Sequence, residues 1–428
     1  MRVKIFIAAL AALLIAASGA SAASSQITLR GTFVVAHADG RAGVKDANFY
    51  LLKTSTGYLD LHLSATPKLK PNQRVVVTGA QQGRDLFVTR IAATAPAPAA
   101  VPTTPAQTLN TLVMLVSWPS APPDFVTPAA AETQVGSTDD DWYQEVSYGR
   151  LGMSATATPW LTIADPGGGC PIGEIWTGAE AAAAASGYNP AAYDREMFYV
   201  PWTAGICPGI AGLAFVGGRI SWIVGEMDTR VTVHELGHNL GLWHSHSLHC
   251  TDASVPVPFS PTCDPFDEYG DLFDAMGHGF YGVGHFNAGQ KNLLGWLAGE
   301  VRDVTPRLRG PVRATLTPLE GAGGLKALAI HADGTTFWVE YRTATGVDAW
   351  LSNFPGALSG VLVHIPQPSD TSNGTNLLDM TPNSVNGFSD AALPVGSSYT
   401  DPSRSFTLTV RSASASGSSL VVRRPVGK

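Results

Sequence analysis

The sequence has few charged residues, no basic surplus, few cysteines and no apolar run of the roughly 20 residues that a membrane-spanning helix needs. Charged side chains make up 14% of its 428 residues, against about a quarter in an average protein, while hydrophobic residues make up 45%. That hydrophobic content excludes a disordered chain, which needs low hydrophobicity and high net charge. The formal net charge of −7 leaves no cationic surplus for phosphates, so we expect no nucleic-acid partner. Four cysteines are too few for a disulfide scaffold.

Glycine and proline, in contrast, are abundant. The chain contains 45 glycines and 30 prolines, which favour turns, loops and short strands over a bundle of helices. Its length exceeds that of one ordinary domain and predicts two or three domains. No internal repeat of fixed period is visible, and the sequence leaves the oligomeric state open.

Residues 1–22 have the parts of a secretory signal peptide. Arg2 and Lys4 provide a positive start, and an uninterrupted apolar run of thirteen residues follows from Ile5 to Ala17. Small residues then offer a cleavage site near Ala22-Ala23. The alternative is an uncleaved anchor, but thirteen residues fall short of the roughly 20 that a membrane-spanning helix needs. We therefore expect a secreted, extracellular protein with no stable membrane anchor.

Residues 23–93 contain short, alternating apolar segments such as Gly31 to Val35 and Arg74 to Val77, with a turn expected at Asp39-Gly40. Turn residues every eight to twelve positions predict a small β-barrel, similar to an OB fold, with a sandwich as the alternative. Residues 94–108 are rich in proline and alanine and have nothing to bury, which predicts an extended linker.

Residues 109–303 have a mixed pattern, and residues 304–428 read as strands again. The first region combines a buried strand at Thr111 to Ser117 with three expected helices, at Asp140 to Val146, Ile172 to Ser186 and Val231 to Leu242. The second region predicts an all-β, sandwich-like accessory domain.

The segment HELGHNLGLWH, residues 234–244, is the strongest chemical signal. On an α-helix, positions i and i+4 differ by about 40° around the axis, so His234 and His238 project from one face and can hold one metal ion. Glu235 lies about 100° further round, where it can reach a metal-bound water instead of the metal. A continuing helix would carry His244 to the wrong side, so the chain must bend, and Gly241 permits that bend. The geometry predicts three imidazoles on zinc with a fourth position open to water.

Met276 follows His244 by 32 residues, in the turn-prone sequence Asp274 to Gly277. A motif of this kind with a later methionine defines the metzincins, whose Met-turn forms an apolar floor below the metal. Together with residues 267–277 and 286–297, the motif resembles the gametolysin family of secreted metzincin endopeptidases. The resemblance implies zinc as the metal, protein or glycoprotein substrates, and a substrate groove beside an edge strand near Leu213 to Val216.

The predicted fold is therefore a central α/β (α+β) metzincin-like zinc protease domain, between an N-terminal β-barrel and a C-terminal all-β domain. We expect a zinc endopeptidase in which Glu235 is the general base that takes a proton from the attacking water and gives it to the leaving amine. The rival hypothesis is a secreted adhesin or carbohydrate-binding protein with a structural zinc site. An intact Glu235 argues against the rival, because a structural site needs no base beside an open position.

Several weaker candidates surround this motif. His246 and His249 are alternative ligands, although no helical geometry places them, and Tyr281 is a candidate transition-state donor five residues after Met276. A bound Ca²⁺ is a further hypothesis, because hard cations take oxygen ligands and acidic residues gather before the Met-turn. Solvated loop acids and helix caps are the competing explanation for these residues, which are Asp264, Asp267, Glu268, Asp271 and Asp274.

The four cysteines, Cys170, Cys207, Cys250 and Cys263, all lie in the expected catalytic domain and allow three pairings. Proximity favours Cys250 with Cys263, and Cys170 with Cys207 by elimination, in an exported chain. No cysteine precedes Cys170, so the N-terminal domain cannot block the zinc with a thiol, and a carboxylate of that domain stays open as an inhibitor. Whether residues 23–107 are a removable propeptide or a permanent module is also open.

Overall fold

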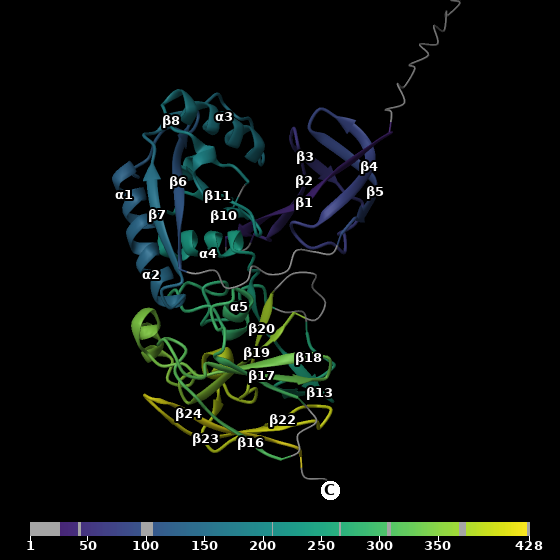
Figure 1. The fold of residues 1–428 in the computed structure, drawn as a ribbon, viewed down its shortest axis with the longest axis vertical. Coiled ribbons are helices and arrows are strands. Elements are labelled where there is room, and N and C mark those ends of the chain that lie inside the picture. Colours follow the sequence, from purple (N-terminus) through teal and green to yellow (C-terminus); the bar gives the residue numbers. More distant parts are fainter. Residues whose placement is uncertain are drawn as a thin grey trace, which may run out of the picture.

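We describe a computed structural model in which the chain forms three lobes (Figure 1). The residues described are 26–41, 44–95, 106–207, 209–264, 267–305, 310–367 and 374–425. The predicted signal peptide and residues 96–105 of the predicted linker 94–108 lie outside these residues, whereas residues 107 and 108 belong to a strand, so the linker is shorter at this end than predicted.

The first lobe is a closed five-stranded barrel, as the sequence predicted. The barrel closes because β1 pairs with both β2 and β4, while β3 pairs with β5. Alternate side chains such as Phe33, Val35, Val75 and Val77 fill its interior, which is the pattern expected of a small barrel. The strands are β1 (Gln26–Gly40), β2 (Ala47–Thr54), β3 (Gly57–His62), β4 (Arg74–Gln82) and β5 (Asp85–Ala93).

Strand β1 is longer than expected, and the predicted turn at Asp39-Gly40 is wrong. The strand continues through both residues and leaves the barrel, where it pairs with a strand of the next lobe, β10 (Ile210–Phe215). The pairing has an irregular register between Asp39 and Gly40, so the glycine serves a bulge in place of a hairpin turn. This partner is about 170 residues distant in sequence, and local turn signals do not report it.

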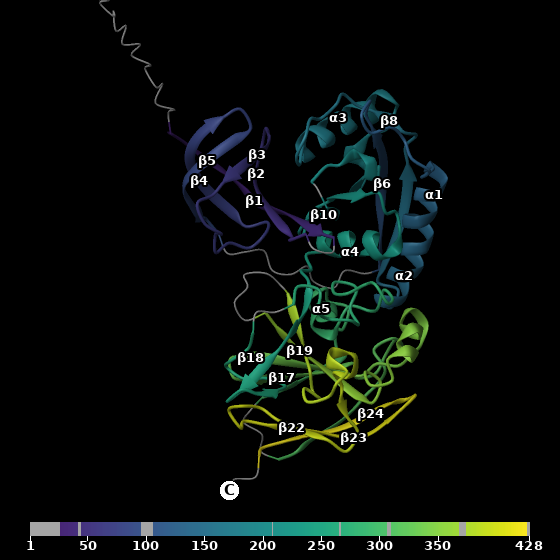
Figure 2. The same cartoon turned by 180° about the vertical axis from the view of Figure 1, so that it is seen from behind.

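The second lobe contains a twisted sheet in the order β10-β11-β9-β6-β7. Four of its strands run parallel and β10 runs antiparallel to its neighbour β11. Together with β1, this makes the barrel and the sheet one continuous hydrogen-bonded system (Figures 1 and 2). The further strands are β6 (Gln107–Ser117), β7 (Leu151–Ala157), β8 (Leu161–Thr162), β9 (Arg195–Val200) and β11 (Ile220–Val224).

Helices cover both faces of this sheet because β6 is apolar on both faces. Leu112, Met114 and Val116 pack in the core that contains α3, whereas Val113 and Leu115 pack in the core that contains α2 and α4. The first helical segment is continuous through α1 (Pro128–Thr133), a π-helical turn η1 (Gln134–Thr138) and α2 (Asp139–Val146). The other helices are α3 (Ile172–Ala185), α4 (Thr229–Asn239) and α5 (Ala288–Leu293), with short 3-10 segments η2 (Pro190–Ala192) and η3 (Trp202–Ala204).

The third lobe is rich in β-structure and consists of two sheets that share one apolar core. The first sheet has the order β12-β20-β19-β18-β17-β15, with β21 at β19, and the second has the order β16-β24-β23-β22. Strand β12 (Ser245–Leu248) comes directly after residue 244, so the segment behind the metal motif already belongs to the sheet of this lobe. The remaining elements are β15 (Val301–Val304), β16 (Val312–Leu316), β17 (Ala327–Ala332), β18 (Thr335–Glu340), η4 (Gly346–Asn353), β19 (Gly360–Pro366), β20 (Thr375–Leu378), η5 (Gly387–Asp390), β21 (Leu393–Pro394), β22 (Ser398–Thr400), β23 (Thr407–Ser414) and β24 (Gly417–Arg423).

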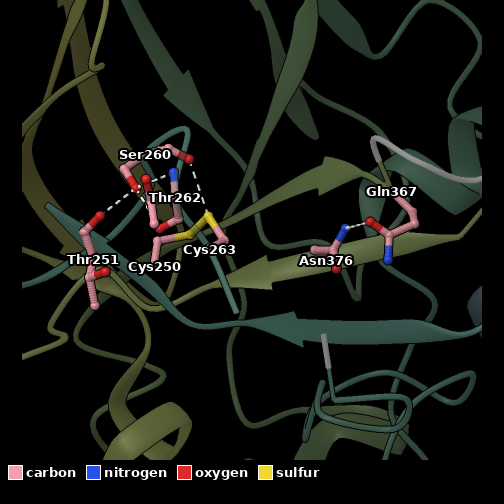
Figure 3. Close-up of a disulfide and its surroundings, with 7 residues drawn as sticks. All are labelled: Cys250, Thr251, Ser260, Thr262, Cys263, Gln367 and Asn376. Atoms are coloured by element: carbon pink, nitrogen blue, oxygen red, sulfur yellow. Dashed lines mark hydrogen bonds between the residues drawn. A yellow bond between two sulfur atoms is a disulfide. The ribbon is translucent and has the colours of Figure 1, made fainter. Parts of the chain in front are cut away.

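Both favoured disulfides are present, Cys170–Cys207 and Cys250–Cys263. The second closes the hairpin of β13 (Cys250–Asp252) and β14 (Val255–Val257), and Figure 3 shows the Ser260 hydroxyl beside it donating to backbone carbonyls. Two disulfides are consistent with an oxidising compartment.

Among the described residues, no helix has both the length and the apolar character needed to cross a membrane.

Candidate metal centre

The centre is built on α4 and the bend that ends it. Asp228 caps the helix by accepting a hydrogen bond from the backbone N–H of Val231. The helix ends at Asn239, three residues earlier than the sequence predicted, and Gly241 then adopts a positive φ of 98°. This left-handed conformation reverses the chain and brings His244 back to the helix. The predicted bend is therefore present at the predicted glycine.

The rings of His234, His238 and His244 form a nearly equilateral triangle. Their centroids lie 4.9 Å (234 to 238), 5.1 Å (234 to 244) and 5.1 Å (238 to 244) apart, and all three side chains are buried. Each Nδ1–H donates outward, to Ala275 O at 2.8 Å, Leu242 O at 2.9 Å and Glu268 Oε1 at 2.7 Å respectively. Such outer hydrogen bonds fix the tautomer of metal-binding histidines and leave Nε2 free to act as a ligand.

The protonation of two of these rings also suits metal binding. Burial lowers the pKa of His238 to about 3 and the pKa of His244 to about 4, although Asp39 opposes both shifts. Both imidazoles are therefore neutral at physiological pH, which is the form that ligates metals. Among the described residues, the buried Nε2 atoms of His234 and His238 have no hydrogen-bond partner. A buried polar atom without a partner is costly, and a metal ion would satisfy both atoms.

Glu235 lies beside the triangle in a cradle made by a glycine. A Cβ atom on Gly212 of β10 would overlap the Glu235 carboxylate, so the strand approaches this closely only because Gly212 has no side chain. The carboxylate is almost fully buried, and its Oε2 has no hydrogen-bond partner among the described residues. Burial, followed by the nearby Asp39 carboxylate, raises the pKa of Glu235 well above its ordinary value.

Met276 lies below the helix. The Met276 side chain is buried, and a Cβ on Gly237 would overlap its sulfur, so the methionine packs directly against α4 between the helix turns that carry the histidines. Asp274 holds the turn by accepting from Met276 N at 2.7 Å, and Met276 O accepts from Ser245 N at 2.8 Å. Met276 is therefore buried against the helix that carries His234 and His238.

Two residues of the barrel also reach the centre, and sequence reasoning missed both. The Asp39 carboxylate lies 2.9 Å from His244 Nε2 through Oδ1, and 3.5 Å and 3.7 Å from the Nε2 atoms of His238 and His234 through Oδ2. His37 lies two residues earlier on the strand, with Nε2 3.3 Å from Asp39 Oδ1. Ligand atoms of His37, Asp39, His238 and His244 all lie within 4.8 Å of one another.

Tyr269 is a third residue that the sequence did not mark. Its hydroxyl donates to the carboxylates of Asp39 and Asp46, each at 3.0 Å, and its ring lies 4.4 Å from that of His244. Its position one residue after Glu268, which binds His244, becomes informative only when the fold is known.

The weaker candidates separate into near and remote residues. His246 is buried in the next layer, where its Nδ1 donates to Glu268 O, and its ring lies 6.2 Å from that of His244. His249 is exposed and packs on Phe388, away from the triangle. Tyr281 is 54% exposed and stacks on His278, and no hydrogen bond among the described residues links it to the histidines.

The acidic residues before the Met-turn are used in two ways. Asp271 accepts hydrogen bonds from Ser245 and His364, and Asp274 from Met276 N and Asn287 N, so both are engaged inside the protein. The Glu268 carboxylate accepts a hydrogen bond from His244 Nδ1–H. Asp271 and Asp274 are thus buried hydrogen-bond acceptors and not the solvated loop acids or helix caps of the competing explanation. Among the described residues, the acids grouped before the Met-turn contribute to a possible cation site only through Glu268, together with Asp46 and His244.

A cleft with a volume of ≈ 980 Å³ opens on the centre. The barrel contributes Asp39, Gly40 and Arg41 to its walls. Residues that follow the barrel in the chain contribute His234, Glu235 and Phe280. A buried cluster of histidine and aspartate side chains thus has the composition and spacing of a metal site, and imidazole with carboxylate suits several divalent metals. No protein-family model matches the chain, and no curated protein matches it.

Proposed function

We propose that the chain is a zinc-dependent endopeptidase whose catalytic unit is the metzincin-like second lobe. The observation that carries this proposal is the combination of three Nε2 atoms directed to one point with a buried carboxylate, Glu235, on the same helix. A purely structural site would have no use for a carboxylate held by a glycine cradle. A cleft whose walls include His234 and Glu235 borders the site.

His234, His238 and His244 would hold the zinc ion, and Met276 would form the floor below it. When bound, zinc supplies a Lewis acid that makes water a nucleophile near neutral pH and stabilises developing negative charge. Glu235 accepts the proton of the attacking water and passes it to the nitrogen of the departing amine. Burial and the nearby Asp39 carboxylate raise the pKa of Glu235, so its carboxylate holds a proton more readily than an exposed one. A peptide substrate would lie along β10 on the side that β1 occupies in this structure, because β10 is paired with β11 on its other side and strand addition needs a free edge.

The Glu235→Gln variant tests this mechanism. Glutamine keeps the shape but cannot take a proton, so we expect zinc binding to be retained and peptide hydrolysis to fall by a factor of roughly 100 or more. Zinc content by metal analysis, and chelator-sensitive cleavage of casein or gelatin, are the measurements. Glu174→Gln on the exposed side of α3 is the matched control and should change neither.

Two results would contradict the proposal. The first is unchanged hydrolysis by zinc-loaded Glu235→Gln protein. The second is a zinc-loaded chain that cleaves no protein in any variant but binds glycans, which would favour the adhesin hypothesis instead. His238→Ala should lose zinc in either case, because the ligand set is then incomplete.

A further inference from the structure

Strand β1 occupies the cleft side of β10. Residues 36–40 pair antiparallel with residues 210–215, so that Asp39 lies opposite Gly212, the glycine that makes room for Glu235. The same strand remains part of the barrel, because residues 32–38 also pair with β2. Figures 1 and 2 show β1 running from the barrel towards β10 and α4. A segment of the chain therefore lies where strand addition would place an extended peptide.

The Asp39 side chain points to the position that the three histidines leave open. Its two oxygens lie between 2.9 and 3.7 Å from all three Nε2 atoms. The separations of 3.5 and 3.7 Å are too long for good hydrogen bonds, and the Nε2 atoms of His234 and His238 have no partner among the described residues. A carboxylate directed into the open face of three imidazoles is a ligand type that zinc accepts as a fourth donor. Tyr269 holds this carboxylate by donating to Oδ1.

A second contact fixes the strand two residues further on. The Arg41 guanidinium donates to the carbonyls of Val224 and Ile210 at 2.6 and 3.1 Å and pairs with Glu226. It also lies 4.2 Å from the centroid of the Trp202 ring, in cation–π range. Three kinds of contact from the second lobe thus engage one arginine of the first. The strand is anchored on the far side of Asp39 from the barrel.

We propose that Asp39 is the fourth protein ligand of the metal and that, through it, the barrel keeps the catalytic centre closed. The inference rests on the proposed function for the identity of the metal and for the activity that is blocked. With Asp39 on the metal, no position remains for water, and β1 excludes a substrate strand from β10. The full chain is then latent, and Arg41 is a positioning residue that holds β1 in the cleft.

Cobalt in place of zinc gives a readout that does not depend on hydrolysis, because the visible spectrum of bound Co²⁺ follows its ligand set. We would load the full chain and the Asp39→Asn variant with Co²⁺ and titrate each with acetohydroxamate. In the wild-type protein we expect little spectral change, and in the variant a saturable change as the added ligand enters the vacated position. Asp85→Asn removes a carboxylate that pairs with His62 on the exposed side of the same barrel, and it should behave as the wild type.

Hydrolysis is the second readout. Asp39→Asn should increase casein cleavage by the full chain about tenfold or more, since each lost 1.4 kcal/mol of closing free energy is a factor of ten. Arg41→Ala should give a smaller increase, with the metal spectrum unchanged in the absence of hydroxamate. If Asp39→Asn folds poorly, Arg41→Ala alone still tests the closure, because it touches no metal ligand.

The possible outcomes separate the two proposals. A wild-type spectrum that responds to acetohydroxamate as strongly as that of Asp39→Asn would overturn the ligand role. A spectral difference without cleavage by any variant would support the ligand role and contradict the protease. Equal cleavage by wild type and both variants would support the protease and overturn the closure.

Discussion

Two buried carboxylates, Glu235 and Asp39, meet at the centre with opposite electrostatic character. Burial raises the pKa of Glu235, with Asp39 adding to the shift, whereas for Asp39 the effect of burial is overcome by His238 and His234, and its pKa lies well below the ordinary range. One carboxylate is therefore disposed to carry a proton and the other to stay ionised.

Away from the centre, Asp139 gives a residue-scale test of how burial changes stability. Asp139 is fully buried where α2 begins, and burial raises its pKa to about 7 despite hydrogen bonds from Thr232 and Gln134. The unfolded chain releases this proton near pH 4, so the folded state binds more protons between pH 4 and 7 and is destabilised as pH rises through that window. Above about pH 7 both states are ionised and the effect is constant.

The Asp139→Asn variant should remove the destabilisation that the folded state undergoes as the pH rises from about 4 to 7. We expect its unfolding free energy to match the wild type near pH 4 and to exceed it increasingly towards pH 7, by roughly 2–4 kcal/mol at the plateau. Urea denaturation at a series of pH values is the measurement. Asp141→Asn, on the exposed face of the same helix, is the control. A gap that did not widen with pH would show that Asp139 titrates normally.

The sequence predicted those residues of the metal centre that lie close together along the chain. His234, Glu235, His238 and His244 fall within eleven consecutive residues and share one helix and one bend, so helical geometry was sufficient to group them. Asp39 and Tyr269 contact the same histidines from 205 and 25 residues away from His244. No local period connects such residues, and only the pairing of β1 with β10 brings Asp39 to the site.

At the scale of elements, the bend after α4 does more than end a helix. Gly241 has a φ of 98°, and an added Cβ would meet only Gly217 Cα, at 3.9 Å. Space is therefore available, and the cost of a side chain is the left-handed backbone itself, about 1–2 kcal/mol. Because this bend carries His244, the cost should also appear in metal binding.

The Gly241→Ala variant separates the two effects when compared with Gly187→Ala. Gly187 ends α3 with a similar φ of 92° and open space around it, so the backbone cost should be equal. We expect both variants to lose about 1–2 kcal/mol of stability in denaturant, but only Gly241→Ala to bind zinc more weakly in competition with a chelator. Equal zinc affinity in both variants would show that the ligand set does not depend on this bend.

Elements were predicted best where the pattern was long or marked by a stop signal. The helix ending at Gly187 and the buried strand at Thr111 to Ser117 were placed within a few residues of α3 and β6. The error at Asp39-Gly40 has a physical cause. An Asp-Gly pair is a turn signal in isolation, but here Asp39 and Gly40 continue the strand beside β10, Gly40 N donates to Asp46 Oδ1, and tertiary pairing overrides the local preference.

At the scale of the whole molecule, the third lobe is interleaved with the metal centre. Strand β12 begins one residue after His244 and pairs with β20, and Ser245 Oγ lies 2.9 Å from Thr375 Oγ1. The sequence predicted an accessory domain after residue 303, because hydropathy patterns report strands and not their partners. We therefore expect substitutions in the third lobe to change the stability of the segment that carries Met276.

Arg342 offers the sharpest test of that coupling. Its buried guanidinium binds Glu340 and Asp348 of the third lobe at 2.8 and 3.2 Å and donates to Phe273 O and His285 O, on either side of Met276. Arg342→Ala leaves two buried carboxylates and two carbonyls without this partner, a loss worth about 3–5 kcal/mol. We expect that loss in denaturant with and without zinc, whereas Arg302→Ala, on an exposed strand, should stay within about 0.5 kcal/mol of wild type. A loss below about 1 kcal/mol for Arg342→Ala would mean that the carboxylates find protons or water locally, and that the third lobe and the Met276 segment fold independently of this contact.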